Sequence, residues 1–257
     1  MKQEVLLKSE SYFKSYIIIL GYNVNIKNKR SKMDKILEML KLQQQLNDST
    51  NGLNWEDGIT KNGKQINWRR CIYLEAAELV ESYPWKHWKD IDASPDYENI
   101  KIEIVDIWHF VMSEALCIYK TQNLGSIDDI ASMISTMVEF DTFSQNDSGE
   151  LLDSYIQIEL VEDMIATLFC QNDINTLVIS FLTMSSKLNL KLPQLYQLYI
   201  GKNILNRFRQ DHGYKEGTYI KVWNGLEDNV VMQKILNENS DILPDNLYKK
   251  LQESYPV

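Results

Sequence analysis

Apolar side chains recur every three or four residues along most of the chain, with polar side chains between them. In DKILEMLKLQQQLND (34–48), for example, Ile36 and Leu40 lie on one line, and Gln43 and Asn47 continue it. This spacing is one face of an α-helix. The same pattern predicts further helices at 69–83, 95–119, 126–140, 150–170, 173–189 and 192–210. Short helices are expected after a glycine-rich loop at 211–229, so we expect an all-α protein.

Two of these helices have clear start signals. Ser94-Pro95-Asp96 supplies a capping hydroxyl, a proline at the first helical position and an acid in the first turn. Ser126 and Asp129 have the spacing of a capping box, with Asp in place of the usual Glu or Gln.

Composition agrees with a helical protein, because the 257 residues include only 10 glycines and 5 prolines. The formal net charge is -9. Binding to nucleic acid or to an anionic membrane needs basic surface, so we expect neither as a partner. Any cationic site must be local.

The cysteines and the N-terminal region bear on location. Cys71, Cys117 and Cys170 are far apart and indicate reduced thiols. The run YIIIL is too short to span a membrane and no cleavage pattern follows it, so we expect a cytoplasmic protein. Residues 1–32 are an extension of unknown role: an appended strand, a loose tail, or translated sequence upstream of a start at Met33. Residues 33–257 are expected to form one domain, with 122–190 as a candidate helical lobe.

Two glutamates of the helix at 69–83 face its apolar side. Glu75 and Glu78 are three residues apart in EAAE, and the apolar Ile72, Ala76 and Leu79 occupy the same side. Burying unpaired carboxylates costs several kcal/mol each, roughly, so cations are expected to share the site.

The next helix repeats this spacing with Glu103 and Asp106 in EIVD. If the two helices pack antiparallel, four carboxylates converge, and such oxygen ligands suit Mg²⁺ or Mn²⁺. The alternative is that the acids cap helices or pair with cations of the same two helices, namely Arg69, Arg70 and Lys101.

Together with its flanking segments, this pattern resembles a known family. The segments are LQQQLN before EAAE, WKHWK between the two acidic pairs, and YIGKNILNRFRQDHGYKEGTY downstream. They resemble the dimeric all-α dUTP nucleotidohydrolases, which are related to MazG-type nucleotide pyrophosphatases. The resemblance covers most of the chain from Met33 and is thinnest at 122–190. It implies a helical bundle of the all-α NTP pyrophosphatase type and a homodimer.

The resemblance also implies an activity. Such an enzyme, a dUTP diphosphatase, hydrolyses dUTP and dUDP to dUMP, releasing pyrophosphate or phosphate, which limits uracil in DNA and supplies dUMP for thymidylate synthesis. Two or more Mg²⁺ ions, with Mn²⁺ as a substitute, would be held by Glu75, Glu78, Glu103 and Asp106. Glu75 or Glu78 would be the catalytic carboxylate that orients the attacking water or accepts its proton.

The resemblance places substrate-binding residues in three segments. Gln43 and Asn47 would read uracil, since an amide offers both a donor and an acceptor; the alternative is a polar patch facing solvent. His87, Lys89, His109 and Phe110 would line the base pocket or meet phosphate; the alternatives are a surface loop and a core histidine. Lys202, Asn206, Arg209, Tyr214 and Lys221 would contact sugar and phosphates, whereas without the resemblance they read as the exposed basic end of an amphipathic helix.

Three other functions remain open from the residues. A related pyrophosphohydrolase acting on another nucleoside triphosphate would keep the metal site without needing Gln43 and Asn47. A di-iron bundle needs Glu-x-x-His twice, whereas Asp106 and His109 give this spacing once and with Asp. A structural or partner-binding helical protein would not need four converging acids.

Overall fold

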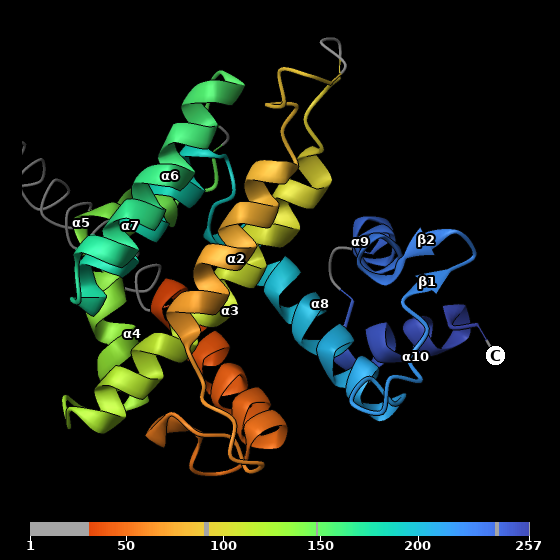
Figure 1. Cartoon of the computed structure of the whole chain (residues 1–257), viewed down its shortest axis with the longest axis horizontal. Helices are drawn as coiled ribbons and strands as arrows, with labels where there is room; N and C mark the ends of the chain where they lie inside the picture. The colour runs from red at the N-terminus through yellow and green to blue at the C-terminus, as the bar shows by residue number, and fades with distance from the viewer. Residues whose placement is uncertain (1–30, 90–92, 148, 240–241, 257) are drawn as a thin grey trace, which may run out of the picture.

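The computed structural model describes residues 31–89, 93–147, 149–239 and 242–256, and the expected all-α architecture is confirmed in them (Figure 1). Among the described residues, the helical elements are an N-terminal helix, nine further α-helices and one 3₁₀ turn, and one hairpin supplies two short strands. Residues 1–30 of the predicted N-terminal extension lie outside the described residues. No helix among those described combines the length and the apolar character needed to cross a bilayer.

A pair of helices forms the centre of the molecule. Helix α2 (Trp68–Glu81) runs beside α3 (Tyr97–Thr121), as Figure 1 shows. Helix α3 is apolar on nearly all sides, which is typical of a helix surrounded by others. It begins at Tyr97, two residues later than Ser94-Pro95 predicted, because the carboxylate of Asp96 accepts a hydrogen bond from the Asn99 backbone N–H and caps the helix.

The N-terminal helix, described over residues 31–51, packs beside α3 and is followed by the 3₁₀ turn η1 (Trp55–Asp57). Ile36, Met39 and Leu40 are completely buried on its inner side. The Tyr199 hydroxyl donates to the Met39 carbonyl oxygen at 2.9 Å, which links this helix to α8 (Leu192–Asp211). The amides Gln43 and Asn47 are therefore turned inward with the apolar residues.

Four helices cover one side of the central pair: α4 (Ile127–Thr136), α5 (Val138–Phe143), α6 (Ser154–Cys170) and α7 (Ile174–Lys187). The capping box of Ser126 and Asp129 is confirmed. The single helix predicted at 126–140 is wrong, because Met137 has an extended backbone that separates α4 from α5. Trp108 of α3 stacks on Phe181 of α7 at 4.8 Å between ring centroids. The central pair and the helices that cover it therefore share one apolar core.

The opposite side carries α8, strands β1 (Val222–Trp223) and β2 (Leu226–Glu227), α9 (Asp228–Glu238) and α10 (Pro244–Ser254). The region 211–229, expected to be loop throughout, contains this antiparallel hairpin. Asn224 and Gly225 form its turn with positive φ angles of 50° and 83°, the conformation that Asn-Gly favours. The chain bends after α8 at Gly213, whose φ is 83°.

Helix α9 lies very close to α8. A Cβ placed on Gly201 of α8 would be 2.7 Å from a methyl group of Leu236 on α9. Phe208 and Trp223, both buried, add an aromatic contact between α8 and the hairpin at 5.6 Å. The glycine and this contact fix the C-terminal elements against α8 by apolar packing.

Candidate active site

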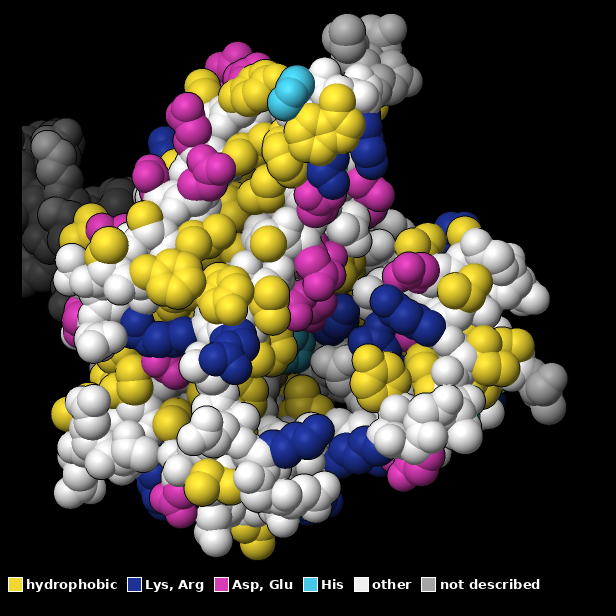
Figure 2. Space-filling view, viewed as in Figure 1, with side chains coloured by type: hydrophobic (Ala, Val, Ile, Leu, Met, Phe, Trp, Pro, Cys, Tyr) yellow, Lys and Arg dark blue, Asp and Glu magenta, His cyan; other side chains and the backbone are white. Residues whose placement is uncertain are grey.

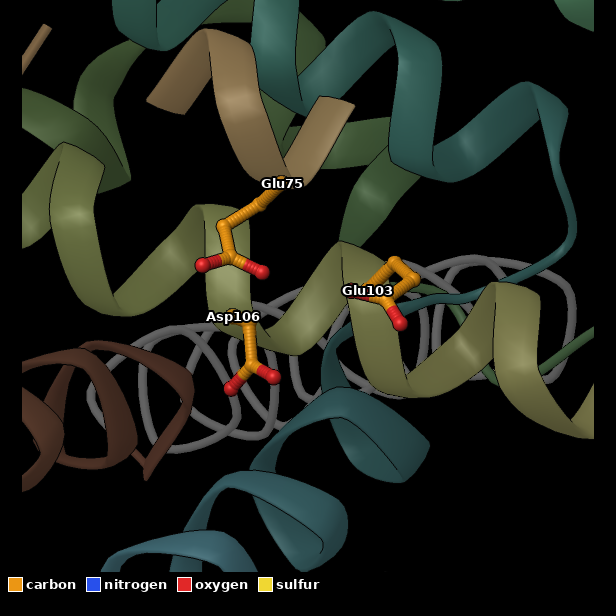
Figure 3. Close-up of side chains that lie close together, drawn as sticks. All are labelled: Glu75, Glu103 and Asp106. Atoms are coloured by element: carbon orange, nitrogen blue, oxygen red, sulfur yellow. The ribbon is translucent and has the colours of Figure 1, made fainter. Parts of the chain in front are cut away.

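Three carboxylates from the two central helices come together. Ligand oxygens of Glu75 on α2 and of Glu103 and Asp106 on α3 all lie within 4.8 Å of one another. Figure 3 shows Glu75 extending from α2 toward the two acids of α3. Among the described residues this is the group whose spacing could hold a metal ion. The predicted convergence of the two acidic pairs is thus present for three of the four acids.

The electrostatics of this carboxylate cluster are unfavourable without a cation. Glu103 is only 7% exposed. Burial raises the pKa of both Glu75 and Glu103, and the negative charge of Asp106 raises both further. The cluster therefore favours the binding of positive charge, either a proton or a metal ion.

Glu78, the fourth predicted ligand, lies apart from this cluster. Its side chain is exposed. It lines a separate cavity of about 440 Å³ together with Glu103, Asp96 and Asn99. Its charge still contributes to the raised pKa of Glu75. Glu78 is therefore close enough to act on the cluster but is not directed into it.

A buried lysine stands next to the cluster. Lys202 Nζ lies 2.7 Å from Asp106 Oδ2 and 2.9 Å from Asn229 Oδ1, and the residue is 3% exposed. It comes from α8, so the site unites α2, α3 and α8. Lys202 was expected to contact the phosphates, and in the structure it already has a carboxylate partner.

A larger cavity of about 530 Å³ opens beside the cluster, bounded by the N-terminal helix, α2, α3 and α8. In Figure 2 a hollow lies between the central helices and the C-terminal elements, with acidic side chains above it and basic side chains around it. Asp106 belongs both to the lining of this cavity and to the carboxylate cluster. The predicted residues that line it are Gln43, Asn47, His109, Phe110, Asn206, Arg209 and Tyr214.

A network of hydrogen bonds closes the inner end of the larger cavity. Gln43 Oε1 accepts from His109 Nδ1 at 2.7 Å and lies 3.2 Å from the Tyr199 hydroxyl, whose one hydrogen is shared with the Met39 carbonyl oxygen. Gln43 Nε2 donates to Asn47 Oδ1 and to Ser113 Oγ, both at 3.1 Å. Gln43 is thus fully engaged inside the protein and orients its neighbours.

The side-chain amide of Asn47 can make further hydrogen bonds. Its Nδ2 donates to Ser113 Oγ at 3.0 Å, and its Oδ1 accepts from Gln43. An amide has two N–H donors and two lone pairs on oxygen. One donor and one lone pair of Asn47 therefore remain unused by these bonds at the cavity wall.

His109 is neutral and its tautomer is fixed. Burial lowers its pKa to about 4. Because the oxygen of Gln43 can only accept, Nδ1 carries the hydrogen, and Nε2 is an acceptor without a partner among the described residues. The ring lies 4.4 Å from that of Tyr199, so His109 combines core packing with a place in the cavity lining.

The aromatic wall of the larger cavity was only partly foreseen. Trp68 and Phe110 both line it, and their rings are stacked with centroids 6.0 Å apart. Phe110 was predicted, whereas Trp68 was not. The signal for Trp68 was available, since Trp68, Cys71 and Glu75 are spaced three and four residues apart on one helix face.

Three of the predicted substrate-binding residues, in two segments, line neither cavity. His87 and Lys89 are exposed in the loop after α2 and belong to the lining of neither cavity. Lys221 is also exposed, and its Nζ lies 3.4 Å from a carboxylate oxygen of Glu227.

Arg209 is held by residues that the sequence did not single out. Its Nε and Nη2 each lie 2.8 Å from the carboxylate of Asp228, and Nη1 donates to Asn206 Oδ1 at 3.2 Å. The Tyr219 hydroxyl donates to the same carboxylate at 2.7 Å. Asp228 follows a strand at the start of α9 and has no periodic pattern around it, which is why sequence reasoning missed it.

Carboxylates beside a cavity with an aromatic wall and buried cations could together hold a metal ion and a phosphate-bearing ligand with a flat ring. A protein-family model described as dUTPase matches residues 35–214. The chain therefore belongs to the all-α dUTPase family and is a dUTP diphosphatase, an enzyme that hydrolyses dUTP. A comparison with curated protein sequences finds no match. Residues 215–257 lie outside the matched segment.

Proposed function

We propose that the enzyme is Mg²⁺-dependent and converts dUTP, and also dUDP, to dUMP, releasing pyrophosphate or phosphate. The observation that carries this proposal is the double position of Asp106. Its carboxylate belongs to the cluster with Glu75 and Glu103 and also lines the larger cavity. A nucleotide in the cavity would therefore have its phosphates beside the acids.

The donor set fits a divalent cation. The cluster is made of oxygen donors only, and hard cations such as Mg²⁺ and Mn²⁺ prefer oxygen. Glu75, Glu103 and Asp106 would hold the metal. Glu78 would join them after a change of rotamer, since it is exposed and already close enough to raise the pKa of Glu75.

The chain's own residues would supply the rest of the chemistry. When bound, the metal would neutralise phosphate charge and increase the acidity of the attacking water. Glu75 or Glu78 would orient that water and accept its proton. Lys202 and Arg209, both largely buried, would stabilise negative charge on the phosphates.

Base recognition would fall to Asn47. Its unused donor and lone pair match the carbonyl oxygen and the N3–H of uracil, whereas cytosine presents the opposite polarity at these atoms. Gln43 would hold Asn47 in this orientation. Trp68 and Phe110 would cover the faces of the base or sugar, and Asn206 and Tyr214, with His109, would contact the sugar and phosphates.

The exposed His87, Lys89 and Lys221 keep a proposed role only if a second subunit or a loop movement brings them to a nucleotide.

A homodimer is proposed on the family resemblance. Exposed apolar side chains support it: Leu74 on α2 is 50% exposed and Phe169 on α6 is 66% exposed. Light scattering at micromolar concentration tests this, and a monomer at all concentrations would contradict it.

The experiment for the reaction is a nucleotide panel. Purified protein is incubated with dUTP, dUDP, dCTP, dTTP and UTP, each with Mg²⁺, with Mn²⁺ or with EDTA, and the products are separated. We expect dUMP and pyrophosphate from dUTP, dUMP and phosphate from dUDP, and no turnover in EDTA. Turnover that persists in EDTA would contradict the metal requirement.

In the cell, the proposed role is to limit uracil in DNA and supply dUMP, and the proposed location is the cytoplasm.

A further inference from the structure

The first residues of α9 hold both buried cations of the active site. The carboxylate of Asp228 binds Arg209 through two hydrogen bonds of 2.8 Å. Asn229 Oδ1 accepts from Lys202 at 2.9 Å and from Arg209 Nη2 at 3.3 Å. These two residues lie outside the segment matched by the dUTPase family model, which ends at residue 214.

The carboxylate of Asp228 is buried, and both of its oxygens accept hydrogen bonds. It is 0% exposed. Besides Arg209, it accepts hydrogen bonds from the Tyr219 hydroxyl at 2.7 Å and from the backbone N–H of Asn229 at 2.8 Å. Burial alone would oppose its ionisation, yet the hydrogen bonds from Arg209 hold its pKa below the ordinary value. An ionised carboxylate in the interior therefore faces one arginine.

These contacts decide which hydrogens of Arg209 remain available. A guanidinium has five N–H donors. Asp228 takes the Nε hydrogen and one on Nη2, Asn229 takes the other on Nη2, and Asn206 takes one on Nη1. Within the described part of the chain these bonds leave one Nη1 hydrogen. Arg209 lines the larger cavity, so this edge is the one a ligand would meet.

Stability alone does not account for the buried charge. Helix α9 is already fixed to α8 by the contact between Gly201 and Leu236 and by the packing of Phe208 on Trp223. A buried ion pair adds little net stability compared with apolar side chains of similar size, because both charges lose their hydration. Asp228 is thus better explained by what it does to Arg209 than by what it adds to packing.

We propose that Asp228 is a positioning residue for phosphate recognition. It holds the guanidinium of Arg209 with the Nη1 edge toward the cavity, and Asn229 holds the ammonium of Lys202 beside Asp106. This inference rests on the proposed function, in which Arg209 and Lys202 meet the phosphates. The C-terminal elements, outside the family match, thereby complete the phosphate side of the active site.

The variant that tests this is Asp228→Asn, which keeps the shape and removes the charge. Binding of deoxyuridine and of the non-hydrolysable analogue α,β-imido-dUTP is measured by calorimetry in the presence of Mg²⁺. We expect binding of the analogue to weaken by about tenfold or more, the scale of one lost charge-assisted contact. Deoxyuridine has no phosphate, so its affinity is expected to stay within about twofold. Hydrolysis of dUTP should lose kcat/KM in parallel with analogue binding.

Two further variants complete the design. Asn229→Ala removes an uncharged acceptor and should give a smaller loss with the same preference for the phosphate-bearing ligand; it carries the test if Asp228→Asn does not fold. Glu238→Gln removes an exposed carboxylate at the end of the same helix and should leave both ligands unaffected.

The possible results distinguish a failure of the inference about Asp228 from a failure of the proposed function. Equal weakening of deoxyuridine and the analogue in Asp228→Asn would mean a merely structural role, and unchanged binding of both would mean no role; either result overturns the inference while the proposed function stands. If the wild-type protein bound the analogue no better than deoxyuridine, the phosphate site itself would be wrong, and the inference would fall with it.

Discussion

Lys202 Nζ lies 2.7 Å from Asp106 Oδ2, so the enzyme supplies its own counter-charge to the carboxylate cluster. Asp106 also lies close to Glu75 and Glu103, and negative charges on these carboxylates repel that of Asp106. A metal ion bound by the three acids would compete with Lys202 for Asp106. On the proposed function, metal binding and the availability of the lysine to a phosphate would therefore be coupled through one carboxylate.

This coupling predicts opposite effects in Lys202→Met. Met has a similar length and no charge, so it removes the competitor for Asp106 while it removes a phosphate contact. We expect the Mg²⁺ concentration for half-maximal activity to fall by about fivefold, which corresponds to about 1 kcal/mol. The value of kcat/KM at saturating Mg²⁺ should fall by at least about tenfold. A Mg²⁺ titration of initial rates measures both; a rise in both quantities, or in the Mg²⁺ requirement alone, would contradict the coupling.

Glu103→Gln separates metal binding from folding. Removing this buried charge should lower kcat at ordinary Mg²⁺ by at least about a hundredfold. In EDTA the same variant should be more stable than the wild type by about 1–3 kcal/mol, because repulsion and desolvation of the charged form are relieved. Thermal melts with and without Mg²⁺ test this. Glu162→Gln, an exposed glutamate of α6, is the matched control and should change neither quantity.

The raised pKa values of Glu75 and Glu103 predict how metal-free stability depends on pH. Between the ordinary glutamate pKa of about 4.3 and the raised values, the folded protein keeps protons that the unfolded chain releases. The contribution of these groups is therefore complete below about pH 4.3 and is lost as the pH rises through their folded pKa values. Urea unfolding in EDTA across this range should show a steeper decline for the wild type than for Glu103→Gln. Parallel curves would refute the assignment.

Asn47→Ala tests how the base is read. Loss of this amide should lower kcat/KM for dUTP by about tenfold to a hundredfold, the cost of buried hydrogen bonds left unmade. Hydrolysis of dCTP should fall less, so the preference for dUTP narrows. Gln45→Ala, an exposed amide on the same helix, serves as the control. An equal fall for both nucleotides would mean that Asn47 supports the cavity without discriminating between bases.

The helices could be predicted from sequence because their signal is local. The apolar spacing of α3 and the capping box at Ser126 and Asp129 gave the elements and one of their starts correctly. The break at Met137 was missed because the apolar pattern continues through it, whereas the burial of Phe140 and Phe143 that accompanies the break depends on tertiary packing. The hairpin at Asn224-Gly225 was missed because two residues are too few to show an alternation.

The site was predictable where periodicity and charge agree. Glu75, Glu103 and Asp106 carry both signals, and the structure brings them together. The partners of the cations, Asp228 and Asn229, depend on how α9 docks on α8, and no local pattern encodes that docking. The engagement of Gln43 by His109 and Tyr199 is equally non-local, so the sequence indicated an inward amide without showing that its hydrogen bonds are already used.

The cavity and the residues that hold its cations come from the N-terminal helix, α2, α3, α8 and the start of α9. Gln43 and Asp228 are thus far apart along the chain, yet the proposed nucleotide site uses both. During synthesis the acids of the carboxylate cluster would emerge well before Asp228, so a nascent chain could gather these carboxylates while Arg209 still lacked its partner. On the proposed function, turnover of dUTP would then require that α9 has docked on α8.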